Sequence, residues 1–367
     1  MTLAQRRRRT LLVLTTTAAL ACTGAAASTT GPDTDGSPRP DRSSRPLAGL
    51  RVLLTNDDSM QAVKPGNSDG LGLYEIRKAL CAAGADVVAI APWQVQSGKG
   101  TAVTNGGTLS LGTRPRPLAG YENDCSGTAS GSPVYGVCLA TGPCGPDSPS
   151  ATPADTVKFA LRAGLAAKAG WKHGPDLVVT GINSGPNVSA QVNDSGTVGA
   201  AVAAVDEGVP AVALSSSGDA SQRDFPVANY RAHARFAAGF IAGLRERDLL
   251  TDRFALKVDY PDVSAGQKAK RPVWTSIGHG KVVWHAYEAR TPSGDLFDIV
   301  PGVCDNAPTS DCTETVSNAD STALLDRGHI SVAPVTADRT YGIRTSGAGH
   351  RELARLERYV EHEAPRS

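Results

Sequence analysis

Several features that would classify this chain quickly are absent from its 367 residues. Neither charge is in excess, because 37 basic and 36 acidic side chains leave a formal net charge of +1, and this balance gives no electrostatic footprint for nucleic-acid binding. Aromatic side chains make up only 5% of the sequence, so we expect a core of Ala, Val and Leu. No apolar run is long enough to cross a bilayer as a helix, and no transmembrane segment is predicted.

Sequence motifs of several common catalytic classes are also missing. No GxGxxG follows the first apolar strand, and neither GxxxxGK[ST] nor GxSxG occurs, so dinucleotide, P-loop and serine-hydrolase chemistries have no fingerprint. No CxxC pair or Cys/His cluster indicates zinc. His279, His285 and His329 lie in or beside expected strands without metal-ligand spacing, and we interpret them as surface or structural residues.

The N-terminus has the pattern of an export signal. Arg6–Arg9 precede the apolar stretch LLVLTTTAALAC, which is too short for a membrane span, and the small residues GAAAS follow. Removal of residues 1–27 is expected, and the paired arginines resemble a twin-arginine signal. A lipid anchor on Cys22 is the alternative. We therefore predict a secreted protein whose residues 28–46, rich in Ser, Pro, Asp and Arg, form a flexible linker.

The cysteines agree with an oxidising compartment. Seven are present, and six remain once the signal is removed. Two pairs bracket short turns and suit local disulfides, namely Cys138–Cys144 and Cys304–Cys312. The remaining two are open to either of two interpretations: Cys81 bonds Cys125, or Cys81 stays a buried free thiol on an apolar helix face.

From Leu47 onward, strand and helix patterns alternate. The apolar runs RVLLTN, DVVAIAP, DLVVTGIN and PAVALS predict buried strands, with helical periodicity between them. Thr152 as N-cap and Pro153 at the first helical position mark one helix start. This alternation predicts an α/β fold, a Rossmann-like parallel sheet with helices on both faces. The segment TAVTNGGTLSL is expected to form a hairpin around Asn105-Gly106.

After about residue 216 the pattern becomes mixed and richer in strands. One long helix is predicted in NYRAHARFAAGFIAGLRER, and strands in FALKVDYP, RPVWTSIG, KVVWHAYEA and HISVAPV. We therefore predict one domain over residues 47–350, with a Rossmann-like core (47–216) and a β-rich C-terminal extension (217–350). Residues 351–367 are expected to form a terminal amphipathic helix and tail.

Polar loops follow three of the predicted strands, where ligands of parallel α/β sheets bind. The loops NDDS, APWQVQSGKGT and GINSGPN offer four oxygen ligands, namely Asp57, Asp58, Ser97 and Asn183. Hard divalent cations such as Mg²⁺ or Mn²⁺ prefer such donors, and a cation would let the two adjacent carboxylates stay ionised. The alternative interpretation of the aspartate pair is a polar turn that closes the strand.

A fourth polar segment opens a small-residue helix. Ser195, Gly196 and Thr197 lie where this helix begins, so free N–H groups and the positive end of the helix dipole favour a phosphate there. The alternative is an ordinary Ser/Thr N-cap. A metal site and an anion site together favour attack on a phosphate ester by a metal-activated water.

In this order, LLTNDDS, APWQVQSGKGT, ATPADTVKFAL, DLVVTGINSGPN, DSGTVGAA and PAVALS resemble the SurE family of survival-protein nucleotidases, over about residues 49–340. The resemblance implies that the metal ligands are Asp57, Asp58, Ser97 and Asn183. It also implies phosphate contacts in one segment and two nearby asparagines, namely Ser195, Gly196 and Thr197, with Asn187 and Asn56.

The resemblance further implies a divalent-metal-dependent phosphoric monoester hydrolase that acts on nucleoside 5′- or 3′-monophosphates, with Asp57 and Asp58 as catalytic residues, in a homo-dimer or homo-tetramer. Alternatives are a phosphatase of other phosphomonoesters or polyphosphate, and a non-catalytic extracellular nucleotide- or phosphate-binding protein. The chain departs from the family pattern after the aspartate pair, where Ser59 replaces the usual Gly and MQAVKPGNSDG precedes the helix. These departures leave substrate choice open.

Overall fold

A computed structural model of the chain describes residues 45–304, 308–338, 351, 354–355 and 357–358. The predicted export signal, nearly all of the predicted linker and most of the predicted C-terminal helix lie outside these residues. None of the described helices is long and apolar enough to cross a membrane.

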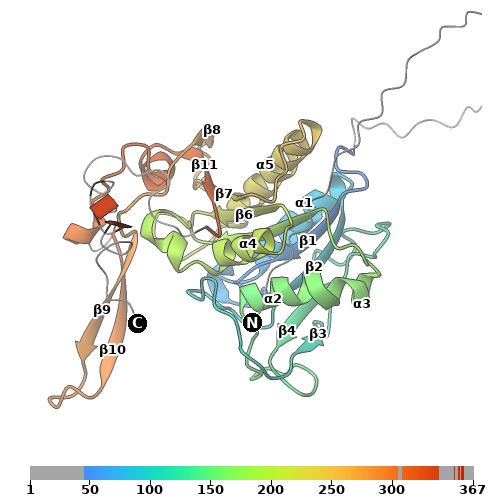
Figure 1. The fold of residues 1–367 in the computed structure, drawn as a ribbon, viewed down its shortest axis with the longest axis horizontal. Coiled ribbons are helices and arrows are strands. Elements are labelled where there is room, and N and C mark those ends of the chain that lie inside the picture. The colour runs from blue at the N-terminus through green and yellow to red at the C-terminus, as the bar shows by residue number, and fades with distance from the viewer. Residues whose placement is uncertain (1–44, 305–307, 339–350, 352–353, 356, 359–367) are drawn as a thin grey trace, which may run out of the picture. The chain divides into compact units, whose positions relative to one another are not determined.

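Nine strands form one sheet in the order β3-β4-β2-β1-β5-β6-β7-β11-β8 (Figure 1). They are β1 (Arg51–Thr55), β2 (Asp86–Pro92), β3 (Ser110–Gly112), β4 (Val134–Cys138), β5 (Leu177–Ser184), β6 (Ala211–Ser216), β7 (Ala255–Tyr260), β8 (Lys270–Trp274) and β11 (His329–Val335). The six strands from β4 to β7 run parallel to their neighbours, while β3 and β11 are antiparallel to β4 and β7. The predicted α/β fold with a mostly parallel sheet is therefore confirmed.

Helices cover both faces of this sheet. They are α1 (Leu71–Ala82), α2 (Pro153–Phe159), α3 (Leu165–Ala169), α4 (Gly196–Asp206) and α5 (Val227–Glu246). One hydrophobic core holds the buried side chains of α1 and α5, and a second holds those of α2 and α4. Strand β1 serves both, because Val52 and Leu54 belong to the first core and Leu53 to the second. Burial on both faces explains why this strand reads as a continuous apolar run.

The helix start predicted at Thr152 is confirmed. Thr152 Oγ1 accepts a hydrogen bond from Asp155 N at 3.0 Å, and Asp155 Oδ2 accepts one from Thr152 N at 3.3 Å. This reciprocal pair is a capping box, with Pro153 following at the first helical position.

The hairpin predicted around Asn105-Gly106 is wrong. In that segment only Ser110–Gly112 forms a strand, and it pairs with β4. The backbone before it is held by the start of α2 instead, because Thr104 N donates to Asp155 Oδ1 at 2.8 Å and Ala102 O accepts from Thr152 Oγ1 at 2.6 Å. Long-range capping contacts therefore override the local Asn-Gly turn signal.

The C-terminal half continues the sheet and adds a separate hairpin. Strands β7, β11 and β8 extend the sheet beyond β6. Among the described residues, strands β9 (Val283–Ala289) and β10 (Phe297–Val303) pair only with each other, as a two-stranded antiparallel sheet. A β-rich continuation of the sheet is thus present in the described part of the extension.

All three cysteine pairs are disulfide-bonded. Both predicted local bridges are present, Cys138–Cys144 and Cys304–Cys312. The third bridge joins Cys81 to Cys125, so the bridged alternative for Cys81 is the correct one.

Candidate active site

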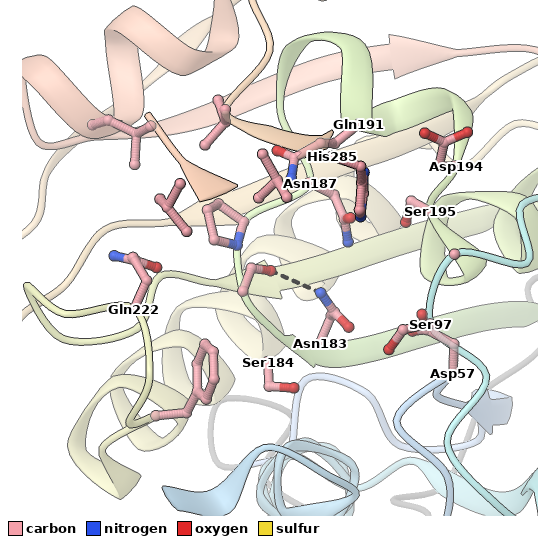
Figure 2. Close-up of a pocket in the computed structure, with 18 residues that line it drawn as sticks. Asp57, Ser97, Asn183, Ser184, Asn187, Gln191, Asp194, Ser195, Gln222 and His285 are labelled. Atoms are coloured by element: carbon pink, nitrogen blue, oxygen red, sulfur yellow. Dashed lines mark hydrogen bonds between the residues drawn. The ribbon is translucent and has the colours of Figure 1, made fainter. Parts of the chain in front are cut away.

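A cleft of about 450 Å³ opens where the central strands end and α4 begins (Figure 2). Its lining includes residues from each of the polar segments singled out in the sequence, namely Asp57, Ser97, Asn183, Asn187 and Ser195. Small-molecule sites in proteins enclose about 300–1,000 Å³, so the cleft is large enough for a small organic ligand. The fold therefore brings together side chains that lie far apart in the sequence.

Asp57 follows β1 and faces the first turn of α4. Its Oδ1 accepts a hydrogen bond from the hydroxyl of Thr197. Burial raises the pKa of the Asp57 carboxyl to about 6, against the opposing effect of that hydrogen bond. Gly196 makes this approach sterically feasible, because a Cβ at that position would lie 2.8 Å from both Cβ and Oδ2 of Asp57. Gly196 and Thr197 thus place the helix start directly against the carboxylate.

Asp58 lies behind Asp57 and does not line the cleft. Its Oδ2 accepts hydrogen bonds from N and Oγ of Ser184, at 2.6 and 2.7 Å. Burial, together with the negative charge of Asp57, raises the pKa of Asp58 well above its ordinary value. The pair therefore carries two negative charges only if another group compensates them.

Asn56 organises the turn that presents the aspartates. Its Oδ1 accepts from Asp58 N at 3.2 Å, and its Nδ2 donates to Ile182 O at 3.0 Å. The side chain is fully buried and does not line the cleft. These bonds tie the end of β1 to the end of β5, on which Asn183 sits.

The loop that carries Ser97 is fastened at both ends. Gln96 N donates to Asp57 O at 2.7 Å, and Gly100 N donates to Asp194 O at 2.9 Å. A Cβ at Gly199 of α4 would lie 1.9 Å from Gly100 O, so only glycine lets the loop pass this close to the helix. The two anchors bring Ser97 to the same edge as Asp57.

Two asparagines come from the end of β5 and the loop after it. Asn183 Nδ2 donates to Gly185 O at 2.8 Å, so its Oδ1 is not used in that bond. Asn187 is held more tightly, because its backbone N donates to Asp259 Oδ1 and its Nδ2 to Ser215 Oγ, both at 2.8 Å. One hydrogen of the Asn187 amide thus remains available to a ligand.

The start of α4 supports both interpretations offered for its sequence. Ser195 is an N-cap, since its Oγ accepts from Val198 N at 3.0 Å, and it also lines the cleft. The first N–H groups of the helix, on Gly196 and Thr197, have no intrahelical acceptor and carry the positive end of the dipole. An ordinary cap and an anion cradle therefore coincide in one turn.

The cleft is rich in carboxylate and neutral oxygens. Its described lining includes the carboxylates of Asp57 and Asp194 but no Lys or Arg. No cluster of three or more His, Cys, Asp or Glu side chains suited to a metal occurs in the described part of the chain. A cation here would depend on the two carboxylates Asp57 and Asp58 and on the neutral oxygens of Ser97 and Asn183. An oxygen-only donor set of this kind fits a hard divalent ion.

Part of the lining was not foreseen from the sequence. Phe225 comes from the segment before α5, and Val283, His285 and Val303 come from the base of the β9–β10 hairpin. His285, interpreted as a surface or structural residue, is exposed and also lines the cleft (Figure 2). No local motif joins these segments to the aspartate loop, so only the tertiary fold reveals them.

Comparison with known proteins agrees with this geometry. The family model described as survival protein SurE matches residues 52–283. A protein named 5′-nucleotidase SurE from Nitratidesulfovibrio vulgaris strain Hildenborough is 34% identical over 298 residues, which covers 79% of this chain and 95% of that protein. One of the same name from Desulforamulus reducens is 30% identical over 301 residues, covering 82% and 98%.

A solved structure shows the same fold. The SurE protein from Aquifex aeolicus superimposes with a TM-score of 0.56 at 24% identity, over 85% of this chain and 99% of that one. The strand-end cleft, the order of the motifs and these matches lead to one conclusion. The chain belongs to the SurE family.

Proposed function

We propose that this protein is a divalent-metal-dependent phosphohydrolase that releases phosphate from nucleoside 5′- or 3′-monophosphates. The observation that carries the proposal is the buried Asp57–Asp58 pair beside a helix N-terminus, at the edge of a cleft whose described lining has no Lys or Arg. A phosphate dianion is repelled by such carboxylates unless a cation lies between them. The printed name of the relatives, 5′-nucleotidase SurE, supports the same activity.

Four side chains would hold the cation, which we propose to be Mg²⁺ or Mn²⁺. They are Asp57, Asp58, Ser97 and Asn183. When bound, the ion neutralises charge on the phosphoryl group and activates a water molecule for attack on phosphorus. Ser184 holds the carboxylate of Asp58, and Asn56 holds its backbone, because Asn56 Oδ1 accepts from Asp58 N.

The start of α4 would bind the phosphoryl oxygens. Ser195 lines the cleft together with Asp57, and the N–H groups of Gly196 and Thr197 follow it in the first turn of the helix. Asn187 would orient the phosphoryl group with its remaining amide hydrogen, since Asp259 and Ser215 fix its position. These groups stabilise negative charge without moving, which is the basis of electrostatic preorganisation.

Asp57 would accept the proton of the attacking water. Thr197 donates to Oδ1, which leaves Oδ2 for the proton. Three serines line the cleft together with His285, but none of them is hydrogen-bonded to this histidine in the described part of the chain, so no serine has an adjacent histidine base.

Turnover with defined metals tests the proposal. We expect release of phosphate from 5′-AMP and 3′-AMP in the presence of Mn²⁺ or Mg²⁺, and loss of that activity with EDTA. Hydrolysis of polyphosphate or sugar phosphates without nucleotide hydrolysis would favour the broader phosphatase. Absence of turnover across all esters and metals, with AMP still bound, would leave a nucleotide-binding protein.

We also propose that the mature protein works outside the cytoplasm as a homo-dimer or homo-tetramer. Three disulfides support an oxidising compartment. Mass spectrometry of the secreted protein should find an N-terminus near residue 28, whereas a lipidated Cys22 would indicate a membrane anchor. Light scattering of the same sample measures the oligomeric state.

A further inference from the structure

We propose that the apolar lining of the same cleft is a binding subsite for the nucleobase of the substrate, with Phe225 as its specificity-determining residue. This inference rests on the proposed nucleotidase function. The apolar lining includes Phe225, Val283, Val303 and Leu325. These four residues come from three separate segments and converge on the cleft that holds Asp57 and Ser195.

Phe225 lies near Gln222 in the lining of the cleft. Gln222 appears on the opposite side from Asp57 and Ser97 (Figure 2). Gly218 connects Gln222 to the phenylalanine: its N donates to Gln222 Oε1 at 3.1 Å, and a Cβ on it would lie 3.1 Å from Phe225 Cε1. A substrate with its phosphate at the start of α4 would therefore extend its organic group toward this ring.

The ring is held by the segment in which this chain departs from the family pattern. Phe225 N donates to Gly66 O at 2.7 Å, and Asn67 Nδ2 donates to Phe225 O at 3.2 Å. Gly66 has a φ of +69°, and a Cβ there would lie 2.7 Å from Asp224 Oδ1, so glycine is required at this contact. The insert after the aspartate pair thus fixes both backbone polar groups of Phe225.

The other side of the insert is also anchored. Asp69 is buried, and its Oδ2 accepts from Val63 N at 2.7 Å and from Lys64 N at 3.1 Å. The loop that positions Phe225 is therefore held by hydrogen bonds between its own residues. A ring held in one position loses little conformational freedom when a flat ligand packs on it.

The hairpin contributes a rigid apolar surface. Val283 and Val303 are cross-strand partners in the β9–β10 register. The next residue, Cys304, is bonded to Cys312, which anchors the end of β10. An aromatic ring together with branched aliphatic side chains, without Lys or Arg among the described lining, suits an uncharged flat heterocycle and not a second phosphate. The geometry points to a nucleoside monophosphate rather than polyphosphate.

Two ligands that differ only by the base test this subsite. The dissociation constants and kcat/KM of AMP and ribose 5-phosphate are measured with Mn²⁺ for the wild type and for Phe225→Leu. We expect the wild type to prefer AMP and the variant to lose about tenfold of that preference, in line with the value of one stacked base. The matched control is Phe240→Leu, which removes an α5 ring that stacks on Phe236 outside the cleft lining and should leave the preference unchanged.

Further variants keep the test decisive. Val303→Ala, on the hairpin, should reduce the same preference. It tests the subsite if Phe225→Leu fails to fold. Asn67→Gly removes the side-chain amide that holds Phe225 O, and glycine adopts the φ of +56° at this position without strain. This variant should also reduce the preference for AMP. If the Phe225→Leu enzyme is active and its preference for AMP is undiminished, the proposal of a nucleobase subsite is wrong, while the proposed phosphohydrolase function still holds. If the wild type binds AMP but hydrolyses nothing, a Phe225-dependent preference in binding supports the subsite while the catalytic proposal fails.

Discussion

The molecule contains two clusters of buried aspartates, and their surroundings differ. Asp259 and Asp320 flank the ammonium of Lys257, which forms ion pairs with both and is itself fully buried. Asp57 and Asp58 are nearly as buried, at 3% and 2% exposure, yet neither forms an ion pair among the described residues. One cluster has a cation from within the fold and the other has none among the described residues.

The difference also appears in the hydrogen bonds. Oδ1 of Asp320 accepts backbone bonds from Ser189, Gly278 and Ser321 at 2.9–3.0 Å, which closes that cluster and fastens the loop after β5. The Asp57–Asp58 pair instead borders a cleft. A buried charge without a partner costs several kcal/mol, so a fold keeps it only where something outside the chain compensates. The first cluster is therefore structural, and the second is the one we propose to bind a cation.

The largest expected effect comes from removing the internal cation. Lys257→Met would leave two buried carboxylates without a partner, and we expect the free energy of unfolding to fall by about 3–5 kcal/mol. Urea denaturation measures this loss. Lys281→Met is the control, because the Lys281 pair with Asp311 is exposed and such pairs contribute at most about 1 kcal/mol. Equal losses in both variants would remove the distinction between the two clusters.

The opposite result is expected at the cleft. Asp58→Asn should lower kcat/KM by at least about a hundredfold, a loss seen even for groups one step removed from a metal. In metal-free buffer its melting temperature should be unchanged or raised, because one of two repelling charges is gone. Asp206→Asn, at the far end of α4, should keep its activity. A clear fall in metal-free stability for Asp58→Asn would instead favour the turn-closing role.

Metal removal and pH should act together. Burial raises the pKa of Asp57 to about 6 from an ordinary value of 3.8, so its contribution to metal-free stability is present below pH 3.8 and is lost as pH rises through about 6. A cation competes with these protons, so added Mn²⁺ should raise the melting temperature more at about pH 7.5 than at about pH 5. At a hundredfold excess over its dissociation constant the gain is about 2.7 kcal/mol. Scanning calorimetry with and without EDTA measures both the metal-free stability and the stabilisation by Mn²⁺. A stabilisation by Mn²⁺ that does not depend on pH would mean that the ion binds away from Asp57.

The sequence predicted the sheet core well because its signals are local. Strands buried on both faces, such as β1 and β5, read as apolar runs whatever packs on them. The carboxyl ends of parallel strands meet at one edge of the sheet, so the sequence placed Asp57 and Asn183 together. Thr152, followed by Pro153, predicted the start of α2 from local sequence in the same way.

Features that depend on distant partners were not predictable. The Asn105-Gly106 turn signal is outweighed by bonds from the start of α2, which no short window contains. In the sequence Lys257 has the pattern of an ordinary strand residue, because its ion-pair partner Asp320 lies far away in the C-terminal segment. Phe225 has no motif at all, because its place in the cleft is set by the backbone of Gly66 and the amide of Asn67.

The smallest expected effect concerns the contact that joins the cleft aspartates to α4. Gly196→Ala would put a Cβ 2.8 Å from Asp57 Oδ2, and we expect a stability loss of about 1–3 kcal/mol from overpacking. Because Asp57 must move away from the helix start, Mn²⁺ affinity and kcat should fall together. Gly239→Ala is the matched helical control, with nothing within 4 Å of its Cβ, and it should stabilise α5 by about 0.5–1 kcal/mol with full activity. A Gly196→Ala protein that is less stable but binds Mn²⁺ as tightly as the wild type would show that the helix start packs against Asp57 without positioning it for the ion.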